Sequence, residues 1–445
     1  FDCFKSICKF AGNITHPAET DEIVEHAFRQ ALTGTPGPVY IEYDFVMHEQ
    51  MWPFPEQQPP ARYRVTSFPA PRSVLESAVK MLRSARCPIL IGGTGIHTSG
   101  AYDIFMRLAR SLNCPVLTTI GGSGTLPETD PQWLAYYSES GREALNHGDV
   151  ILAIGTSFPE TLNYAKYRHF SAGPSDRKWI LVEQDISAVG VNRPIDLPIV
   201  GRMQDVLPEL CDLLEQGAPT ARRNERLESW RLRFEREREA MCRSVSSSEK
   251  INPSELMLEA RKAIPDEATI VIDSGLTLMH QIAYFEKRAR RFLWTSKYGH
   301  LGSGIPYAIG AQLALGNNHP VCLITGDGGM GFHIMEFETA VRHRLPIVIV
   351  INDDRALGAE MEAHMQHIGH TIEVSFSPVR YDGMATAMGG YGEYVDTVAG
   401  IAPAIGRALA QKRPAIVQVA VDPKSALNYA VPLRDELEVD DVLGA

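Results

Sequence analysis

Two short clusters of glycine and acidic residues in the last third of the chain have the types and spacing needed to hold an anion through a metal ion. Residues 326–329 read GDGG and follow a β-branched run that ends at Thr325. Residues 352–354 read NDD and follow a second run that ends at Ile351. Parallel strands place their carboxyl ends at one edge of a sheet, so both clusters are expected at the same edge.

The chemistry suited to these clusters is the binding of a phosphate group together with a cation. Glycines let the backbone approach a phosphate closely, and the N-terminus of a following helix offers free N–H groups. The anion then needs a counter-charge, which a hard divalent cation supplies through protein and phosphate oxygens. Asp327 and an acid of the second cluster suit that role. Either cluster alone is common in ordinary turns, but the two in this order predict a metal–phosphate site.

The elements that must position the clusters follow an α/β pattern. Strand-like runs occupy residues 269–273, 321–325, 347–351 and 415–419. Continuous β-branched runs are typical of parallel strands buried on both faces. A helix with Ile334, Phe337 and Val341 on one face is predicted between the two clusters.

A second α/β unit precedes the first. Its predicted strands lie at residues 88–93, 115–117, 150–155 and 179–182 and alternate with helical patterns. Residues 92–95 read GGTG after the first of these strands, where a dinucleotide-binding loop would lie. The G-x-G-x-x-G pattern is not completed, and no acidic residue ends the next strand, so a structural turn is predicted.

The remaining segments read as connections. Residues 21–33 predict an amphipathic helix and residues 39–43 a strand, before a proline-rich connector at 52–71. Residues 218–243 are dense in arginine and glutamate and predict a solvated helical linker rather than a binding patch. The chain begins with Phe1 instead of methionine, in the middle of a domain-like pattern, so further sequence is expected upstream.

Composition narrows the class of protein. The 445 residues include 43 basic and 54 acidic side chains, a net charge of −11, with no basic run to neutralise phosphates of a nucleic acid. No apolar stretch approaches the roughly 18 residues needed to cross a bilayer. The seven cysteines form no C-x-x-C pair, which predicts neither a zinc site nor a disulfide framework. We therefore expect a cytoplasmic protein that binds neither nucleic acid nor membrane.

The segment 326–360 resembles the thiamine-diphosphate motif of the superfamily that includes acetolactate synthase, benzaldehyde lyase and pyruvate decarboxylase. That motif begins with GDG and typically ends with NN. The resemblance implies that Asp327, Asp354 and the backbone carbonyl of Ala356 bind Mg²⁺. It also places the glycines of this segment at the diphosphate, namely Gly326, Gly328 and Gly329. Asp354 departs from the commoner asparagine and adds negative charge beside the diphosphate.

Further segments extend this resemblance. Residues 298–311 resemble the segment that passes under the thiazolium ring, and Leu301 aligns with the bulky residue that bends the cofactor. Residues 273–277 match a second diphosphate loop, which implies cofactor contacts by Gly275 and Thr277, although Leu276 replaces a residue that is often polar. Glu360 falls where pyruvate decarboxylases place an acid near the substrate, and an ordinary polar residue is an equal alternative. Other side chains that would face the substrate are His300, Met330 and His333.

The resemblance covers nearly the whole chain and implies an α/β, three-domain architecture of parallel-sheet domains, the first only partly present. Residues 1–65 correspond to the end of a pyrimidine-binding domain plus a connector, and 72–215 to a central Rossmann-like domain. A charged helical linker at 216–248 leads to a diphosphate-binding domain at 249–445. The central domain binds FAD in some members, but no signature here supports FAD. The family's catalytic glutamate belongs to the earlier part of the first domain and has no counterpart in this sequence.

The resemblance implies an enzyme that, provided the N-terminal region expected upstream is supplied, uses thiamine diphosphate and Mg²⁺ to cleave or form a carbon–carbon bond next to a carbonyl. Decarboxylation of a 2-keto acid, acetolactate-synthase-like carboligation and cleavage of a 2-hydroxy ketone all remain open, with 2-keto acids, aldehydes or 2-hydroxy ketones as substrates. A homodimer or homotetramer is implied, because the family builds its active site between subunits. Two alternatives remain: a cofactor-binding but catalytically silent regulatory paralogue, and a nicotinamide-dependent dehydrogenase, which the incomplete glycine pattern disfavours.

Overall fold

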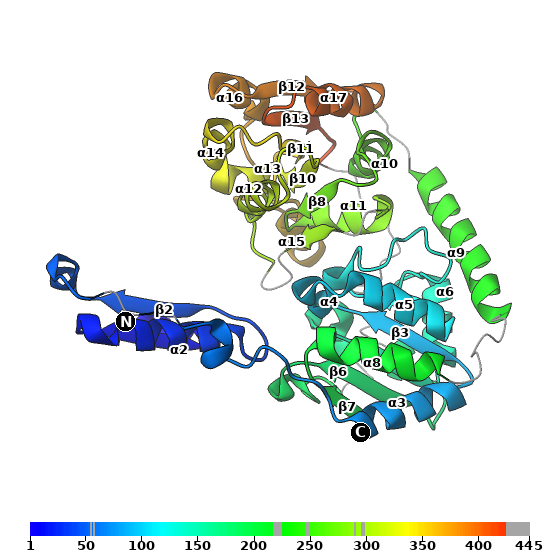
Figure 1. The fold of residues 1–445 in the computed structure, drawn as a ribbon. Helices are drawn as coiled ribbons and strands as arrows, with labels where there is room; N and C mark the ends of the chain where they lie inside the picture. The colour runs from blue at the N-terminus through cyan, green and yellow to red at the C-terminus, as the bar shows by residue number, and fades with distance from the viewer. Residues whose placement is uncertain are drawn as a thin grey trace.

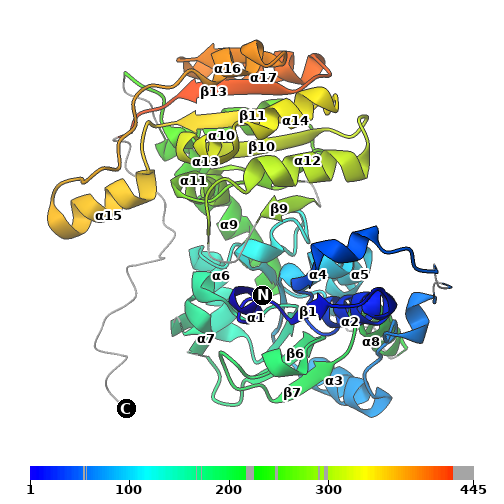
Figure 2. The same cartoon turned by 90° about the vertical axis from the view of Figure 1, so that its left-hand side faces the viewer.

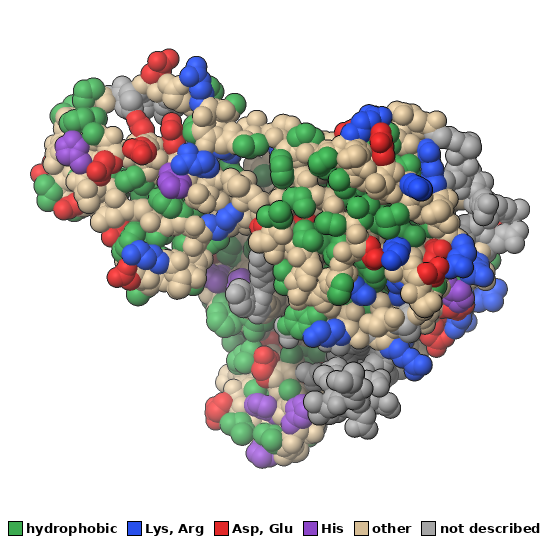
Figure 3. Space-filling view, turned by 90° about the horizontal axis from the view of Figure 1, so that it is seen from below, with side chains coloured by type: hydrophobic (Ala, Val, Ile, Leu, Met, Phe, Trp, Pro, Cys, Tyr) green, Lys and Arg blue, Asp and Glu red, His purple; other side chains and the backbone are tan. Residues whose placement is uncertain are grey.

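The computed structural model describes residues 1–53, 56, 58–166, 168–171, 173–216, 225–245, 249–288, 291–294 and 299–423. Three units follow one another along the chain: a projecting N-terminal arm, a central unit and a C-terminal unit (Figure 1). The two larger units are parallel α/β folds, as predicted. Among the described helices, none is long and apolar enough to span a membrane. Acidic and basic side chains are interspersed on the face shown in Figure 3.

The arm is a two-stranded parallel sheet with one helix packed on it. Strand β1 (Phe10–Ile14) pairs with β2 (Val39–Tyr43), and helix α2 (Thr20–Leu32) connects them. The predicted helix and strand of this region are therefore confirmed within one residue at each end. The arm also contains short helical turns: α1 (Asp2–Lys5), η1 (Pro17–Glu19), η2 (Phe45–Glu49) and η3 (Pro60–Arg62).

The central unit is built on a five-stranded parallel sheet with strand order β4-β3-β5-β6-β7. Its strands are β3 (Pro88–Gly92), β4 (Val116–Thr118), β5 (Val150–Ile154), β6 (Lys178–Glu183) and β7 (Leu197–Val200). Its helices are α3 (Arg72–Ser84), α4 (Thr94–Ser99), α5 (Tyr102–Leu112), α6 (Glu139–His147), α7 (Arg168–Ser171) and α8 (Met203–Glu215), with η4 (Ile120–Gly122), η5 (Glu160–Ala165) and η6 (Ile186–Ala188). Strand β7 was not predicted, because it is a short edge strand that contains a proline.

The glycine-rich turn after β3 is explained by packing. A Cβ atom on Gly93 would lie 2.3 Å from the carbonyl oxygen of Gly155, and one on Gly95 would lie 2.6 Å from the Gly155 Cα. The Gly95 N–H donates to the Gly155 carbonyl at 2.9 Å. The glycines thus let the ends of β3 and β5 approach each other closely, which agrees with the predicted structural turn.

The C-terminal unit is built on a six-stranded parallel sheet with strand order β12-β13-β11-β10-β8-β9. Its strands are β8 (Thr269–Ile272), β9 (Phe292–Trp294), β10 (Val321–Gly326), β11 (Val348–Asp353), β12 (Tyr391–Val395) and β13 (Ala415–Ala420). Its helices are α10 (Pro253–Ala263), α11 (Leu276–Tyr284), α12 (Gly304–Leu315), α13 (Asp327–His333), α14 (Glu336–Arg342), α15 (Gly358–Ile368), α16 (Tyr381–Ala387) and α17 (Val398–Ala410). The single helix predicted between the acidic clusters is therefore two helices, α13 and α14, and α15 projects from the body of the unit (Figure 2).

The charged linker is helical, as predicted, but it is not solvated on all of its faces. Helix α9 (Glu225–Ser244) buries Leu227, Trp230 and Phe234, which are 6%, 4% and 4% exposed. The rings of Phe234 and Trp133 meet edge to face with centroids 5.4 Å apart. A narrow apolar stripe is enough to dock a helix whose other faces are charged, so α9 completes the core of the central unit. Of the predicted linker, residues 217–224 and 246–248 lie outside the described part.

Candidate cofactor site

A hollow opens at the carboxyl edge of the C-terminal sheet, where β8, β10 and β11 end. It is lined by Ser274, Gly275, Leu276, Thr277, Leu301, Gly326, Asp327, Gly328, Gly329, Asp354, Ala356, Leu357, Gly358, Ala359 and Glu360. Apart from His300, Met330 and His333, which lie outside this lining, every site residue predicted from the sequence is among them. The structure therefore brings together four segments that are separated by as many as 86 positions in the sequence, Ser274 to Glu360.

Strand pairing brings the two acidic clusters together. Gly326 at the end of β10 is in register with Asn352 of β11, so Asp327 and Asp354 follow neighbouring strand ends. Their side chains are 4% and 7% exposed. Within the described part of the chain, the Asp327 Oδ1 atom has no hydrogen-bond partner. One Asp354 oxygen accepts the Ala356 N–H at 3.2 Å.

The two carboxyl groups are held in an environment that disfavours two negative charges. Burial first, and the neighbouring Asp354 second, raise the pKa of Asp327 to about 8. Burial likewise raises the pKa of Asp354 to about 6. A divalent cation bound between the two carboxyl groups offsets the repulsion of their negative charges, so that both can ionise. The Asp327 Oδ1 atom, which has no hydrogen-bond partner in the described part of the chain, is available to coordinate it. The donor set, two carboxylates with a backbone carbonyl, has the hard oxygen chemistry that Mg²⁺ prefers and leaves positions for phosphate oxygens.

Only one acid of the second cluster faces the hollow. Asp353 is turned toward β13, where its carboxylate accepts a hydrogen bond from Gln418 Nε2 at 2.7 Å. The same nitrogen donates to the Val379 carbonyl at 2.7 Å. The Asn352 amide donates to Thr277 Oγ1 at 3.3 Å and so ties the α11 side of the hollow to β11. Asn352 was not predicted as a site residue, because this contact depends on helix α11, a distant segment of the sequence.

Glycines are required where the backbone itself lines the hollow. A Cβ atom on Gly329 would lie 2.8 Å from both Asp273 Oδ2 and Thr325 Oγ1. One on Gly358 would lie 2.7 Å from Asp354 Oδ2. Helix α13 begins directly at Asp327, so its first N–H groups are available to an anion at the same place as the carboxylates.

Leu301 and Glu360 occupy different parts of the site. Leu301 packs against Gly275, because a Cβ atom on Gly275 would lie 3.2 Å from the Leu301 Cδ2 atom. Glu360 is exposed in the first turn of α15 and lies at the rim. Met330 is 1% exposed in the core of the unit and His333 is exposed, so neither contributes to the lining. Tyr298, which belongs to the resembling segment, lies outside the described residues.

Across the described residues, no group of three or more His, Cys, Asp or Glu side chains is arranged to hold a metal ion. A metal at this edge would thus depend on Asp327, Asp354 and the carbonyl of Ala356, completed by oxygens of its ligand. The position of Ala356 is fixed by an antiparallel bridge to Ser375. On each side of it, the Leu357 N–H donates to the Val374 carbonyl at 2.8 Å and the Phe376 N–H donates to the Arg355 carbonyl at 2.7 Å.

We expect the stability of the cofactor-free chain to fall as pH rises from about 4 to about 8. The folded-state pKa values of Asp327 and Asp354 are raised above the unfolded value, so the folded state binds more protons in this window. The measurement is the urea-unfolding midpoint across that range, compared with Asp327→Asn. The variant should show a shallower decline, and an unchanged slope would show that this pair does not titrate as described. Binding of the metal should correspondingly release protons near neutral pH.

The fold and the hollow define a parallel α/β protein with a cofactor-type site at the carboxyl edge of its sheet. Residues 75–210 match the family model for the central domain of thiamine pyrophosphate enzymes. Residues 273–419 match the model for the C-terminal, thiamine-pyrophosphate-binding domain of the same enzymes. Together the two matches cover more than half of the chain. The chain belongs to the thiamine-diphosphate-dependent enzyme superfamily.

Similar proteins include acetolactate synthase large subunits. The chain is 28% identical to a probable acetolactate synthase large subunit of Methanococcus aeolicus, over 96% of this chain and 74% of the relative. It is 27% identical to the acetolactate synthase isozyme 3 large subunit of Escherichia coli, over 80% of this chain and 62% of the relative. It is also 25% identical to the sulfoacetaldehyde acetyltransferase of Castellaniella defragrans, over 91% of this chain and 71% of the relative.

Proposed function

We propose that this chain binds thiamine diphosphate with Mg²⁺ in the hollow and that, once the family's glutamate-bearing N-terminal segment is supplied, it catalyses acetolactate-synthase-like carboligation of 2-keto acids. The observation that carries the proposal is the pairing of Asp327 and Asp354, two buried acids with raised pKa values, beside a glycine-rich helix start. Such a pair is costly unless a cation binds. The similarity to acetolactate synthase large subunits supports the reaction class.

Each part of the hollow has a distinct role in this proposal. Asp327, Asp354 and the Ala356 carbonyl hold the metal, and Gly328 and Gly329 let the backbone approach the diphosphate. Gly275 and Thr277 line the hollow at the start of α11, and the Asn352 amide holds the Thr277 side chain by a hydrogen bond. Leu301 supports the organic part of the cofactor. When bound, thiamine diphosphate supplies the carbon nucleophile and the electron sink needed to break or form a carbon–carbon bond next to a carbonyl.

The rim residues would contact the substrate. Glu360 lies at the entrance, where its carboxylate is placed to exchange a proton with a substrate carbonyl oxygen. His300 is exposed beyond the lining, so a role for it requires the turn that carries it to move toward the hollow. We further propose a homodimer or homotetramer, supported by large exposed side chains on α12 to α14: Leu313, Phe332 and Met335 are 61%, 64% and 65% exposed.

The direct test is turnover of pyruvate with thiamine diphosphate and Mg²⁺ by the protein in which the glutamate-bearing N-terminal segment is supplied. We expect formation of acetolactate, detected as acetoin after acid treatment, together with carbon dioxide, and no product when the metal is chelated. Acetaldehyde without acetolactate would show a decarboxylase instead. Consumption of sulfoacetaldehyde without formation of acetolactate from pyruvate would place the activity with the sulfoacetaldehyde acetyltransferase. Tight cofactor binding without turnover of keto acids, sulfoacetaldehyde or 2-hydroxy ketones would identify a silent paralogue.

A further inference from the structure

A buried carboxylate that faces several backbone N–H groups lies beneath the hollow. Asp273 directly follows β8 and is 1% exposed. Its Oδ1 atom accepts the N–H groups of Ser274 at 2.9 Å and Gly302 at 3.0 Å. Its Oδ2 atom accepts the Gly302 N–H at 3.1 Å, the Gly304 N–H at 3.4 Å and the Thr325 hydroxyl at 3.2 Å. Multiple N–H and O–H donors of this kind stabilise a buried carboxylate without a cationic partner.

These hydrogen bonds connect Asp273 to the start of α12. The N-cap residue of this helix, Ser303, makes no side-chain capping hydrogen bond. The carboxylate of Asp273 caps the helix from a different segment, because it accepts the N–H of Gly304, the first residue of α12. A negative charge at the N-terminus of a helix is also favoured by the helix dipole.

The same carboxylate reaches the segment that carries the metal ligand. Thr325, whose hydroxyl bonds to it, lies two residues before Asp327 in the chain. A Cβ atom on Gly329 would lie 2.8 Å from Asp273 Oδ2, so the carboxylate also touches the first turn of α13. Asp273 is thus in contact with both the diphosphate end of the hollow and the turn before α12.

Leu301 depends on this turn for its position. Its carbonyl carbon is bonded to the Gly302 nitrogen, and the Gly302 N–H points at both oxygens of Asp273. Gly302 has φ +90°, and a Cβ there would lie 2.5 Å from Phe332 Cβ, so the turn has little freedom to rearrange. The anchored peptide therefore fixes the direction in which the Leu301 side chain leans over Gly275.

We propose that Asp273 is a positioning residue that sets Leu301 at a fixed place relative to Asp327. This inference rests on the proposed function, in which Asp327 helps hold the diphosphate end and Leu301 supports the organic end of thiamine diphosphate. Asp273 touches neither end of the cofactor and acts through the turn. Asp273 thus holds Leu301 and Asp327, which lie on different segments of the chain, in a fixed position relative to each other.

The test is a double-mutant cycle on cofactor affinity. Asp273→Asn leaves one acceptor oxygen and turns an amide NH₂ group toward one set of the N–H donors, so the turn should be held less firmly. We expect the Kd of thiamine diphosphate with Mg²⁺ to rise by about 10-fold, the scale of one lost charged hydrogen bond. Leu301→Ala should give a similar rise, and the double variant should show no further loss. The Kd of inorganic diphosphate with Mg²⁺ should change by less than about threefold in all three variants.

The control variant is Asp149→Asn in the central unit. Asp149 is also buried, at 8% exposed, and accepts the N–H groups of Arg86 and Cys87 at 2.8 Å each. Its replacement should lower stability and leave both ligand affinities unchanged. If Asp273→Asn does not fold, Thr325→Val removes one of the same hydrogen bonds without a change of shape. It should weaken thiamine diphosphate binding and spare inorganic diphosphate.

Three results would overturn the inference, and they are distinguishable. Additive losses in the double variant would show that Asp273 does not act through Leu301. An equal loss of inorganic diphosphate binding would show that it supports only the anion end. No metal-dependent binding of thiamine diphosphate by the unmodified chain would remove the proposed function itself, before any variant is compared.

Discussion

Asp327→Ala should abolish metal-dependent binding of thiamine diphosphate, with an affinity loss of at least about 100-fold, or roughly 3 kcal/mol. The side chain supplies a buried oxygen without a hydrogen-bond partner in the described part of the chain, and this oxygen is the natural first ligand for the cation. Without it, the metal retains one carboxylate and a carbonyl from the protein. Isothermal calorimetry of the full chain with cofactor and Mg²⁺ measures the change.

The matched control for this prediction is Asp354→Asn. It keeps an oxygen ligand at the second position and removes the like charge that raises the pKa of Asp327. We expect metal-dependent binding to persist within about tenfold, with fewer protons released on binding. The cofactor-free Asp327→Ala protein should also unfold at a higher urea concentration near neutral pH, because one of two costly buried acids is gone. Unimpaired binding by Asp327→Ala would disprove the metal assignment.

The sequence was sufficient to predict which segments meet at the hollow. Strand-like runs and the acidic clusters after them have a fixed relation, because every parallel strand in a sheet presents its carboxyl end at the same edge. Asp327 and an acid of the second cluster could therefore be placed side by side before any contact was known, and the family resemblance pointed to Asp354. The short edge strands β7, β9 and β12 were missed because they have three to five residues and little apolar periodicity.

Roles that depend on a neighbouring segment could not be predicted. Asp353 and Asp354 are adjacent and identical in type, so the strand pattern alone does not distinguish them, and the contact with Gln418 shows that Asp353 is turned away from the hollow. Asp273 looks like an ordinary strand end until its bonds to Gly302 and Gly304 are seen. In α9, charged residues are so frequent that the apolar stripe is not apparent from the sequence. Three buried side chains are nevertheless enough to dock the helix.

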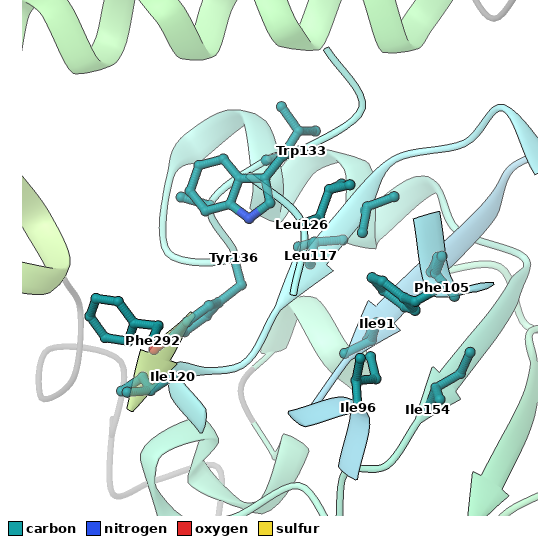
Figure 4. Packing of buried hydrophobic residues seen from close by; sticks show 14 of the residues in the cluster. Ile91, Ile96, Phe105, Leu117, Ile120, Leu126, Trp133, Tyr136, Ile154 and Phe292 are labelled. Atoms are coloured by element: carbon teal, nitrogen blue, oxygen red, sulfur yellow. The ribbon is translucent and has the colours of Figure 1, made fainter. Parts of the chain in front are cut away.

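A buried ion pair links the central unit to the C-terminal unit. The Lys287 ammonium, after α11, lies 2.9 Å from a Glu128 oxygen of the central unit, and the two side chains are 2% and 8% exposed. The pairing is reinforced by backbone: the Glu128 N–H donates to the Lys287 carbonyl at 2.9 Å. Nearby, Phe292 of β9 lies beside Tyr136 and Ile120 of the central unit (Figure 4).

Lys287→Met should destabilise the chain by about 3 kcal/mol, because it removes the cation paired with the buried Glu128 carboxylate and leaves Arg238 as a neighbouring positive charge. The variant keeps the length and apolar stem of the side chain, so the measured loss of stability reflects the missing charge and not a change in side-chain volume. Adding Glu128→Gln should restore part of the stability, since the unpaired charge is then removed. Urea unfolding followed by tryptophan fluorescence measures all three proteins.

The control for this prediction is Lys178→Met. Lys178 pairs with Asp196 at 3.0 Å, but the two side chains are 53% and 34% exposed. Solvent screens such a pair, so its loss should cost less than about 1 kcal/mol. Similar effects of the two lysine substitutions would show that the Lys287–Glu128 pair does not couple the units. A large effect of Lys287→Met alone would show that the sheet edge of the C-terminal unit is held by the central unit, so that mutations far from the hollow can change its geometry.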